Sequence, residues 1–362
     1  MFGKLESLRG VAACLVVIFH SSFSFGLEPL AFFDNSYLFV DFFFILSGFV
    51  MSFAYADKIS DGMPFKKYIF LRLGRIYPLH LFMLLVWVPY ILMKQYLYTS
   101  GYGGSDQFEK SNIFTFISNV FLVHSMGIHS DLSWNGPSWS ISTEFFAYIA
   151  FFFVSALIDR KKTLFVPALI SIACYMFLYS LGGSSLNITT DYGFFRCLGA
   201  FYSGVLLYRL RPMIPNVDSP KALTFLELTS IILVVYTVSN AFLSKPFIGL
   251  SLLSFIFTVA VFSNSQSGVF GNLLENKLMR SIGLWSYSIY LIHAIVMLVA
   301  ANVAEYLLKI NMNQAFEYWS VLINMVLLSL IILISKYTYI YVEKHFRDAV
   351  KRKVEKNYNS IL

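Results

Sequence analysis

Residues 39–56 read FVDFFFILSGFVMSFAYA, an apolar run that a single charged residue, Asp41, interrupts. With one flanking residue on each side, the segment 38–57 has the length of about twenty residues that a helix needs to cross the hydrocarbon core of a bilayer. The crossing segment must be helical, because an unpaired backbone is too costly in lipid. Residues 38–57 are therefore predicted to form a membrane-spanning helix.

Nine further windows share this length and apolar character. They are 7–26, 76–98, 140–158, 164–181, 192–208, 224–243, 247–264, 281–305 and 318–336. The first is expected to be a retained span, since no small-residue cleavage site follows it. The run 113–124 is too short to cross and is expected to be re-entrant or interfacial. We predict an all-α, polytopic membrane protein with about ten spans.

The composition excludes a water-soluble enzyme. Of 362 residues, 57% are hydrophobic and only 13% are charged. In soluble domains about a quarter of all residues are charged. The net charge of +7 fits the Lys and Arg of cytoplasmic loops better than nucleic-acid binding. Three cysteines, Cys14, Cys174 and Cys197, lie in apolar stretches without paired spacing, so neither a disulfide framework nor a metal site is expected.

The loop charges predict the orientation. With the N-terminus inside, 22 Lys and Arg residues fall on the inner side, and only Lys94, Lys110, Lys245 and Lys309 fall outside. Positive residues concentrate on the cytoplasmic side of membrane proteins, so both termini are predicted to be cytoplasmic. We predict a transmembrane domain over residues 1–343, including a long outer loop 99–139 that faces substrate, and a basic cytoplasmic tail over 344–362.

Ionisable residues inside the predicted spans mark candidate functional positions, because a charge is costly in lipid. Glu227 lies close to the cytoplasmic end of its span and is expected to reach the interface. The others are predicted to lie between the middle of the membrane and its outer face. They are His20, Asp41, Glu144, Arg196 and His293.

Arg9 and His20 are spaced so that one elongated ligand could touch both. Eleven residues return a helix to within roughly 20° of the same face and separate the two Cα atoms by about 16 Å along the axis. The guanidinium of Arg9 would hold an anionic group at the inner end. A snorkelling arginine and a packed histidine are the alternative interpretation of this spacing.

A second basic pair, Arg72 and Arg75, precedes Pro78, which is expected in the first turn of the third span. At positions i and i+3 the two arginines would share a helix face and could clamp phosphates. Ordinary positive-inside charge is the alternative for this pair.

Several segments together resemble the acyltransferase-3 family of bacterial membrane O-acyltransferases. The segment LESLRGVAACLVVIFH contains Arg9 and His20, FVDFFFILSGFVMS contains Asp41 and Ser47, and RLGRIYPLHLF contains Arg72 and Arg75. WSISTEFFAY contains Trp139 and Glu144. Weaker matches surround Arg196 and end at His293. The resemblance covers nearly the whole chain in the expected order.

The resemblance implies transfer of an acyl group, usually acetyl, from cytoplasmic acyl-CoA to a hydroxyl of a surface glycan or lipid-linked saccharide, in the bacterial plasma membrane. It implies that Arg9 and His20 are the essential pair and that Glu144 is a further catalytic residue. Substrate-binding roles are expected for seven residues: Asp41, Ser47, Arg72, Arg75, Trp139, Arg196 and His293. Neither a metal nor nucleic acid is expected to take part.

The residue types suit this chemistry. A sugar hydroxyl needs a base to attack a thioester, and histidine titrates close to neutral pH, so His20 is the first candidate. Glu144 could orient His20 or the sugar. His293 is the alternative base, and direct transfer and an acyl-His20 intermediate both stay open. The competing function is a transporter or flippase for a lipid-linked glycan or a small acid, which buried charges would also suit.

Overall fold

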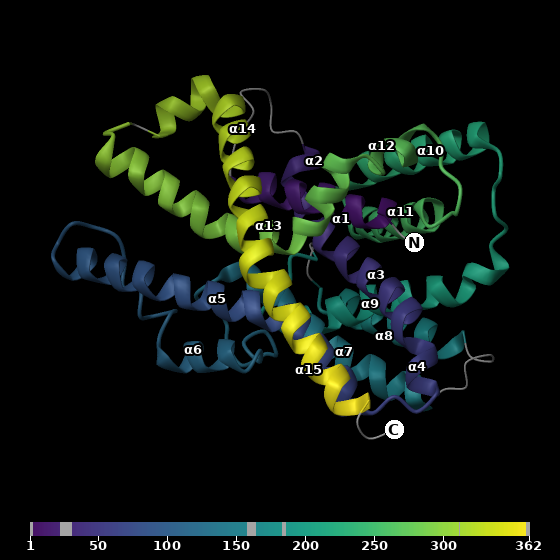
Figure 1. The fold of residues 1–362 in the computed structure, drawn as a ribbon. Helices are drawn as coiled ribbons and strands as arrows, with labels where there is room; N and C mark the ends of the chain where they lie inside the picture. Colours follow the sequence, from purple (N-terminus) through teal and green to yellow (C-terminus); the bar gives the residue numbers. More distant parts are fainter. Residues whose placement is uncertain (1–2, 22–30, 158–163, 183–185, 311, 360–362) are drawn as a thin grey trace.

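The computed structural model describes residues 3–21, 31–157, 164–182, 186–310 and 312–359. Within these ranges every regular element is a helix, and the long helices pack into one bundle (Figure 1). In chain order, the α-helices are α1 (Gly3–His20), α2 (Ala31–Asp34), α3 (Phe39–Met51), α4 (Asp57–Ser60), α5 (Phe65–Thr99), α6 (Ile113–Val120), α7 (Trp139–Leu157), α8 (Phe165–Ser180), α9 (Gly193–Leu210), α10 (Pro220–Ser239), α11 (Lys245–Phe262), α12 (Val269–Leu274), α13 (Lys277–Asn302), α14 (Met312–Thr338) and α15 (His345–Asn359).

The prediction of an all-helical membrane protein is confirmed. Six helical stretches in the described part of the chain are long and apolar enough to cross a membrane: Ser36–Ser60, Phe65–Thr99, Gly136–Leu157, Pro220–Ser239, Lys277–Tyr306 and Val321–Asn357. The other four predicted spans coincide with α1, α8, α9 and α11, although the end of the first, 22–26, lies outside the described residues. The count of ten spans and the cytoplasmic termini stay predictions.

The structure corrects the expected start of the third span. Helix α5 begins at Phe65, so Pro78 lies in the helix interior and not in its first turn. Membrane helices tolerate an internal proline because neighbouring groups satisfy the backbone atoms that it leaves unpaired. Arg72 and Arg75 therefore belong to the same continuous helix and not to a preceding loop.

Glycines bring two pairs of helices into close contact. A Cβ atom on Gly48 of α3 would lie 1.9 Å from the carbonyl oxygen of Phe201 on α9, and one on Gly204 would lie 1.9 Å from that of Ile45. Helices in membranes commonly approach each other through such small residues. Helices α1 and α13 meet in the same way at Gly10 and Gly283.

Glu227, expected to reach the interface, has a carboxylate that is buried inside the protein. Its residue exposure is only 1%. Its two carboxylate oxygens accept hydrogen bonds from the backbone N–H groups of Gly268, Phe270 and Gly271 at 2.9–3.0 Å. Glu227 satisfies the backbone donors at the start of α12, where a helix lacks internal acceptors.

The C-terminal segment forms a long helical course. Helix α14 leads through a π-helical segment, Tyr339–Lys344, into α15, and the two extend across the bundle in Figure 1. Helix α15 packs against α5, where a Cβ atom on Gly74 would lie 2.7 Å from Val350. The predicted tail is therefore helical over 345–359 and docked on the bundle.

The segment between α5 and α7 contains α6, which forms part of the short apolar run 113–124, whose re-entrant or interfacial position stays a prediction. Asn112 caps α6 by accepting a hydrogen bond from the Thr115 N–H at 3.0 Å. Beyond α6, the ring of His124 stacks on that of His80 from α5, with centroids 5.6 Å apart. Burial, and secondarily the neighbouring His80, lower the pKa of His124 to about 3, so this imidazole is neutral at physiological pH.

Candidate active site

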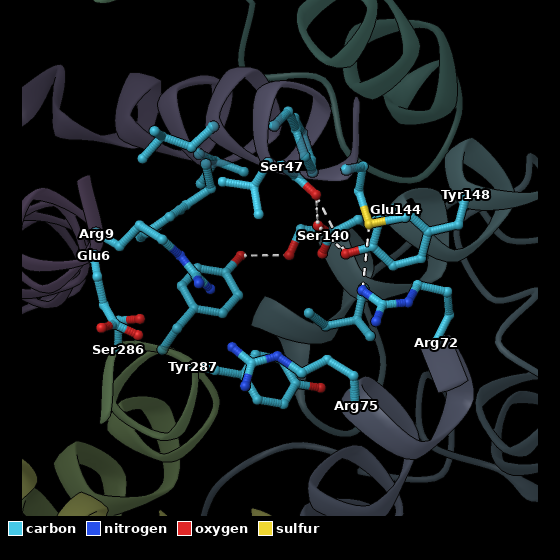
Figure 2. A pocket seen from close by; sticks show the side chains of 18 of the residues that line it. Glu6, Arg9, Ser47, Arg72, Arg75, Ser140, Glu144, Tyr148, Ser286 and Tyr287 are labelled. Atoms are coloured by element: carbon cyan, nitrogen blue, oxygen red, sulfur yellow. Dashed lines mark hydrogen bonds between the residues drawn. The ribbon is translucent and has the colours of Figure 1, made fainter. Parts of the chain in front are cut away.

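A cavity of about 380 Å³ opens within the bundle, between helices α1, α3, α5, α7 and α13. Figure 2 shows charged and hydroxyl side chains pointing into it from opposite sides. Its lining includes five residues predicted as functional, namely Arg9, Ser47, Arg72, Arg75 and Glu144. The folded chain therefore brings together residues that lie up to 135 positions apart in the sequence.

Glu144 forms the acidic part of the cavity. Its Oε1 accepts hydrogen bonds from the Ser47 hydroxyl at 2.5 Å and from the Tyr148 hydroxyl at 2.7 Å. Glu144 and Tyr148 lie one turn apart on α7, so they share a helix face, whereas Ser47 reaches them from α3. Bonds to a charged acceptor are stronger than bonds between neutral groups, and the three side chains therefore hold one another in place.

Arg72 lies close to this group. Its guanidinium carbon lies 4.4 Å from the centre of the Tyr55 ring and 6.0 Å from that of Tyr148. It donates to the hydroxyl of Tyr55 and, at 3.3 Å, to the sulfur of Met51. Its buried Nε has no hydrogen-bond partner among the described residues. Arg72 thus retains a donor for a ligand.

Arg75 faces the same cavity but is committed to an ion pair. Its Nη1 lies 3.0 Å from Oε1 of Glu343, and Oε2 of Glu343 accepts from the Ser288 hydroxyl at 3.0 Å. The side chain of Glu343 is fully buried. Glu343 was not predicted from the sequence, although a carboxylate directly after the aromatic-rich segment SKYTYIYV was a visible signal.

Arg9 reaches into the cavity from α1, on the side opposite Arg72 (Figure 2). In the part of the chain that the structure describes, its guanidinium makes no hydrogen bond or ion pair. A partly buried guanidinium without a carboxylate partner is suited to bind an anionic ligand.

His20 borders a different cavity. This groove of about 560 Å³ is lined by His20, Ser21 and mostly apolar residues of α13 and α14, and the two cavities have no described lining residue in common. The sequence predicted one site for Arg9 and His20, whereas the structure places them at successive cavities along the contact of α1 and α13.

The ring nitrogens of His20 and His293 have defined roles. Nδ1 of His20 lies 2.9 Å from the carbonyl oxygen of Val16, and Nδ1 of His293 lies 2.6 Å from that of Tyr290. A carbonyl oxygen only accepts, so Nδ1 is the donor in each neutral ring and Nε2 carries the lone pair. The two ring centroids are 4.8 Å apart, and the buried Nε2 of His293 has no partner in the described chain.

Tyr290 lies between the first cavity and His293. Its ring lines the first cavity, and its hydroxyl accepts a hydrogen bond from Ser140 at 3.0 Å. Its carbonyl oxygen accepts the bond from His293, one helical turn further along α13. Tyr290 therefore contacts both Ser140 at the first cavity and His293, whose ring lies beside that of His20.

Asp41 and Arg196 form a buried ion pair between α3 and α9. The guanidinium contacts both carboxylate oxygens, with Nε–Oδ1 and Nη2–Oδ2 distances of 3.0 and 2.7 Å. The ring centre of Trp139 lies 5.3 Å from the guanidinium carbon. None of the three lines the first cavity. Substrate binding by them stays a prediction, and their geometry is that of a pair that joins two helices.

No group of three or more His, Cys, Asp or Glu side chains within the described ranges is arranged to hold a metal ion. The cavity that holds the arginines instead offers guanidinium groups, hydroxyl groups and a carboxylate. Such a site can bind a phosphorylated or otherwise anionic ligand.

Comparisons with known proteins identify a family and two similar proteins. A family model described as an acyltransferase domain matches residues 2–337. "Putative peptidoglycan O-acetyltransferase YrhL" of Bacillus subtilis (strain 168) is 26% identical in an alignment of 328 residues, which covers 83% of this chain and 49% of that protein. "Protein 2 in picA locus" of Rhizobium radiobacter is 38% identical over 92 residues, 25% of this chain and 46% of that protein. The alignments cover about half the length of these relatives. No solved structure matches the chain.

Proposed function

Because the chain belongs to the acyltransferase-3 family, we propose that it is a membrane O-acyltransferase. It transfers an acyl group, most simply acetyl, from acyl-CoA to a hydroxyl of a surface polysaccharide or lipid-linked saccharide. The observation that carries the proposal is the cavity inside the bundle, where Arg9, Arg72 and Glu144 converge from three helices. A scaffold without chemistry would have no use for such costly groups in a membrane.

The arginines bind the donor. Arg9 makes no hydrogen bond or ion pair within the described residues, and the Nε donor of Arg72 is unpaired there, so both are available to the anionic groups of acyl-CoA. Arg75, which Glu343 holds, completes the positive lining. The acyl end of the donor then extends along the contact of α1 and α13, past Tyr290, toward His20.

His20 acts as the general base. Its Nδ1–H donates to Val16, which leaves the Nε2 lone pair to accept the proton of the sugar hydroxyl. The hydroxyl oxygen attacks the thioester carbonyl, the new C–O bond forms as the C–S bond breaks, and the CoA thiolate leaves and takes up a proton. Glu144 is the third catalytic residue of this proposal, and by accepting hydrogen bonds from Ser47 and Tyr148 it fixes the positions of these two side chains in the cavity.

The expected location is the bacterial plasma membrane, with both termini in the cytoplasm and the segment 99–139 facing the acceptor. Acyl-CoA is a cytoplasmic metabolite, which suits an entry on the side of Arg72. The peptidoglycan O-acetyltransferase relative supports a glycan acceptor.

An assay with labelled acetyl-CoA and purified protein in detergent tests this function. We expect the wild-type protein to cleave the thioester slowly and to transfer the label when a membrane glycan fraction is added. His20→Ala should abolish transfer while protein accumulation and acetyl-CoA binding persist, and Arg9→Ala should weaken binding. A wild-type protein that neither binds nor cleaves acetyl-CoA would contradict the proposal and favour transport. Full activity of His20→Ala would move the base role to His293.

A further inference from the structure

A third cavity, of about 630 Å³, adjoins the first where α15 packs beside the start of α5. The two cavities share three lining residues, Tyr55, Arg72 and Arg75. We call the third cavity, with these residues and its wall of α15, the basic vestibule. It is a mouth through which a ligand can reach Arg72 from the surface.

The basic vestibule has a strong positive charge. Only two of its eleven lining residues are acidic, Asp348 and Glu355. Each contacts a basic neighbour on α15, at 3.2 Å from Arg347 and 3.9 Å from Lys351. The basic members outnumber them threefold and are Lys58, Lys67, Arg72, Arg75, Arg347 and Lys351. A concave site with this excess of cations attracts polyanions and not neutral sugars.

Helix α15 is held against this site by specific contacts. Gly74 lies between the two arginines of α5 and leaves room for Val350 of α15. The buried ion pair of Arg75 with Glu343 fixes the segment directly before α15. Arg347 and Lys351 follow on one face of the helix, one turn apart. The wall of the basic vestibule is therefore positioned by packing and is not a loose tail.

We propose that the basic vestibule binds the nucleotide end of the acyl donor, and that Arg347 and Lys351 of α15 contact its phosphates. The inference rests on acyl-CoA being the donor, as proposed above. The nucleotide carries a diphosphate and a 3′-phosphate, which match a cationic cavity, and the slender thiol arm continues past Arg72 into the first cavity. Helix α15 is thus part of the donor site, although it lies beyond residue 337, where the family match ends.

Truncated donors test this inference. We compare KM and kcat for acetyl-CoA and for acetyl-pantetheine, which lacks the nucleotide, in the wild type and in the double variant Arg347→Gln/Lys351→Gln. Loss of two charge-assisted contacts should raise KM for acetyl-CoA by about tenfold with kcat little changed. KM for acetyl-pantetheine should stay the same. Adenosine 3′,5′-bisphosphate should inhibit the wild type competitively and the variant about tenfold more weakly.

The matched control is Arg352→Gln/Lys353→Gln, which removes the same charge from exposed positions of α15 outside the vestibule lining. It should leave both KM values unchanged. An unchanged KM for acetyl-CoA in the vestibule variant would overturn the inference, as would equal losses with both donors, which would indicate a disturbed fold. Inactivity of the wild type toward both donors would instead refute the proposed function.

The same cations could bind the phosphate of an anionic lipid. A second arm of the experiment distinguishes such a lipid from the nucleotide of the acyl donor. The kinetics are repeated in nanodiscs with only zwitterionic lipid and in nanodiscs that contain phosphatidylglycerol. We expect the KM difference between the vestibule variant and the wild type in both. A difference that occurs only with phosphatidylglycerol would show a lipid site and overturn the inference.

Discussion

The hydroxyl of Ser47 on α3 donates a hydrogen bond to Glu144 on α7, with 2.5 Å between Oγ and Oε1. We predict that Ser47→Ala lowers the rate of acyl transfer by about tenfold, since a hydrogen bond to a charged group contributes about 1.5 kcal/mol or more. Glu144 keeps its bond from Tyr148, so activity should fall without being lost. The measurement is the initial rate of label transfer from acetyl-CoA.

Ser171→Ala is the control for this variant. Ser171 is buried and bonds the hydroxyl of Ser203 at 2.7 Å, away from the cavity. It should keep the wild-type rate. Equal rates for Ser47→Ala and Ser171→Ala would show that the bond between α3 and α7 has no part in catalysis.

We predict that the ion pair of Arg75 and Glu343 stabilises the folded protein. Glu343→Gln removes the charge that balances the partly buried Arg75. Breaking a buried pair by removing one partner costs about 3 kcal/mol, so the variant should unfold at a clearly lower temperature in detergent. Glu355→Gln, at an exposed pair with Lys351, should change stability by no more than about 0.5 kcal/mol. Unfolding of both variants at the wild-type temperature would contradict this role of the buried pair.

The histidine stack at α6 makes the stability of the protein depend on pH. Burial lowers the pKa of His124 to about 3, whereas the unfolded chain has an ordinary value of about 6.5. Between these values the unfolded state takes up a proton that the folded state excludes. Stability is therefore fully present above about pH 6.5 and is lost as the pH falls, by up to about 1.4 kcal/mol per pH unit for one site.

Thermal unfolding of the wild type and of His124→Asn at several pH values between 7.5 and 4.5 measures this effect. The variant should be less stable at neutral pH but should lose less stability on acidification. His345→Asn, at an exposed histidine of α15, should retain the pH dependence of the wild type. An identical pH dependence in His124→Asn and the wild type would refute the assignment to His124.

The positions of the long helices were predictable because the bilayer allows few alternatives. A run such as 39–56 has to be helical in lipid, and its length of about twenty residues is enough to identify it as a membrane span. The extension of α5 to Phe65 and the docking of α15 were not predictable in this way. Both involve polar stretches, and their placement depends on a tertiary contact, Gly74 with Val350, that has no signature in either segment alone.

The sequence predicted part of the lining of the first cavity, but it predicted neither Glu343 nor the separation of Arg9 from His20. Glu144 was identified as a charge inside an apolar run, Arg9 by its spacing to His20 and Arg72 by its spacing to Arg75, and the structure gathers Arg9, Arg72 and Glu144 around one cavity. The spacing of Arg9 and His20 predicts that they lie on the same face of α1. Which cavity each side chain faces depends on the neighbouring helices. Tyr290 lines the first cavity and not the second, and a tyrosine in an apolar run resembles any interfacial tyrosine in the sequence.

The contact of α3 with α9 makes the sharpest prediction for folding. In Gly48→Ala the new methyl group would lie 1.9 Å from the carbonyl oxygen of Phe201, so the two backbones would have to separate. Since α3 carries Ser47 next to this glycine, the separation would also displace the group around Glu144. We expect strongly reduced accumulation in the membrane and loss of transfer, measured by quantitative immunoblotting and by activity per folded protein.

Gly249→Ala on α11 is the matched control, because its Cβ would meet no atom within 4 Å, and alanine is favoured over glycine in a helix by about 1 kcal/mol. The control should therefore accumulate at least as well as the wild type, and normal accumulation of Gly48→Ala would mean that the close approach of α3 and α9 is not required.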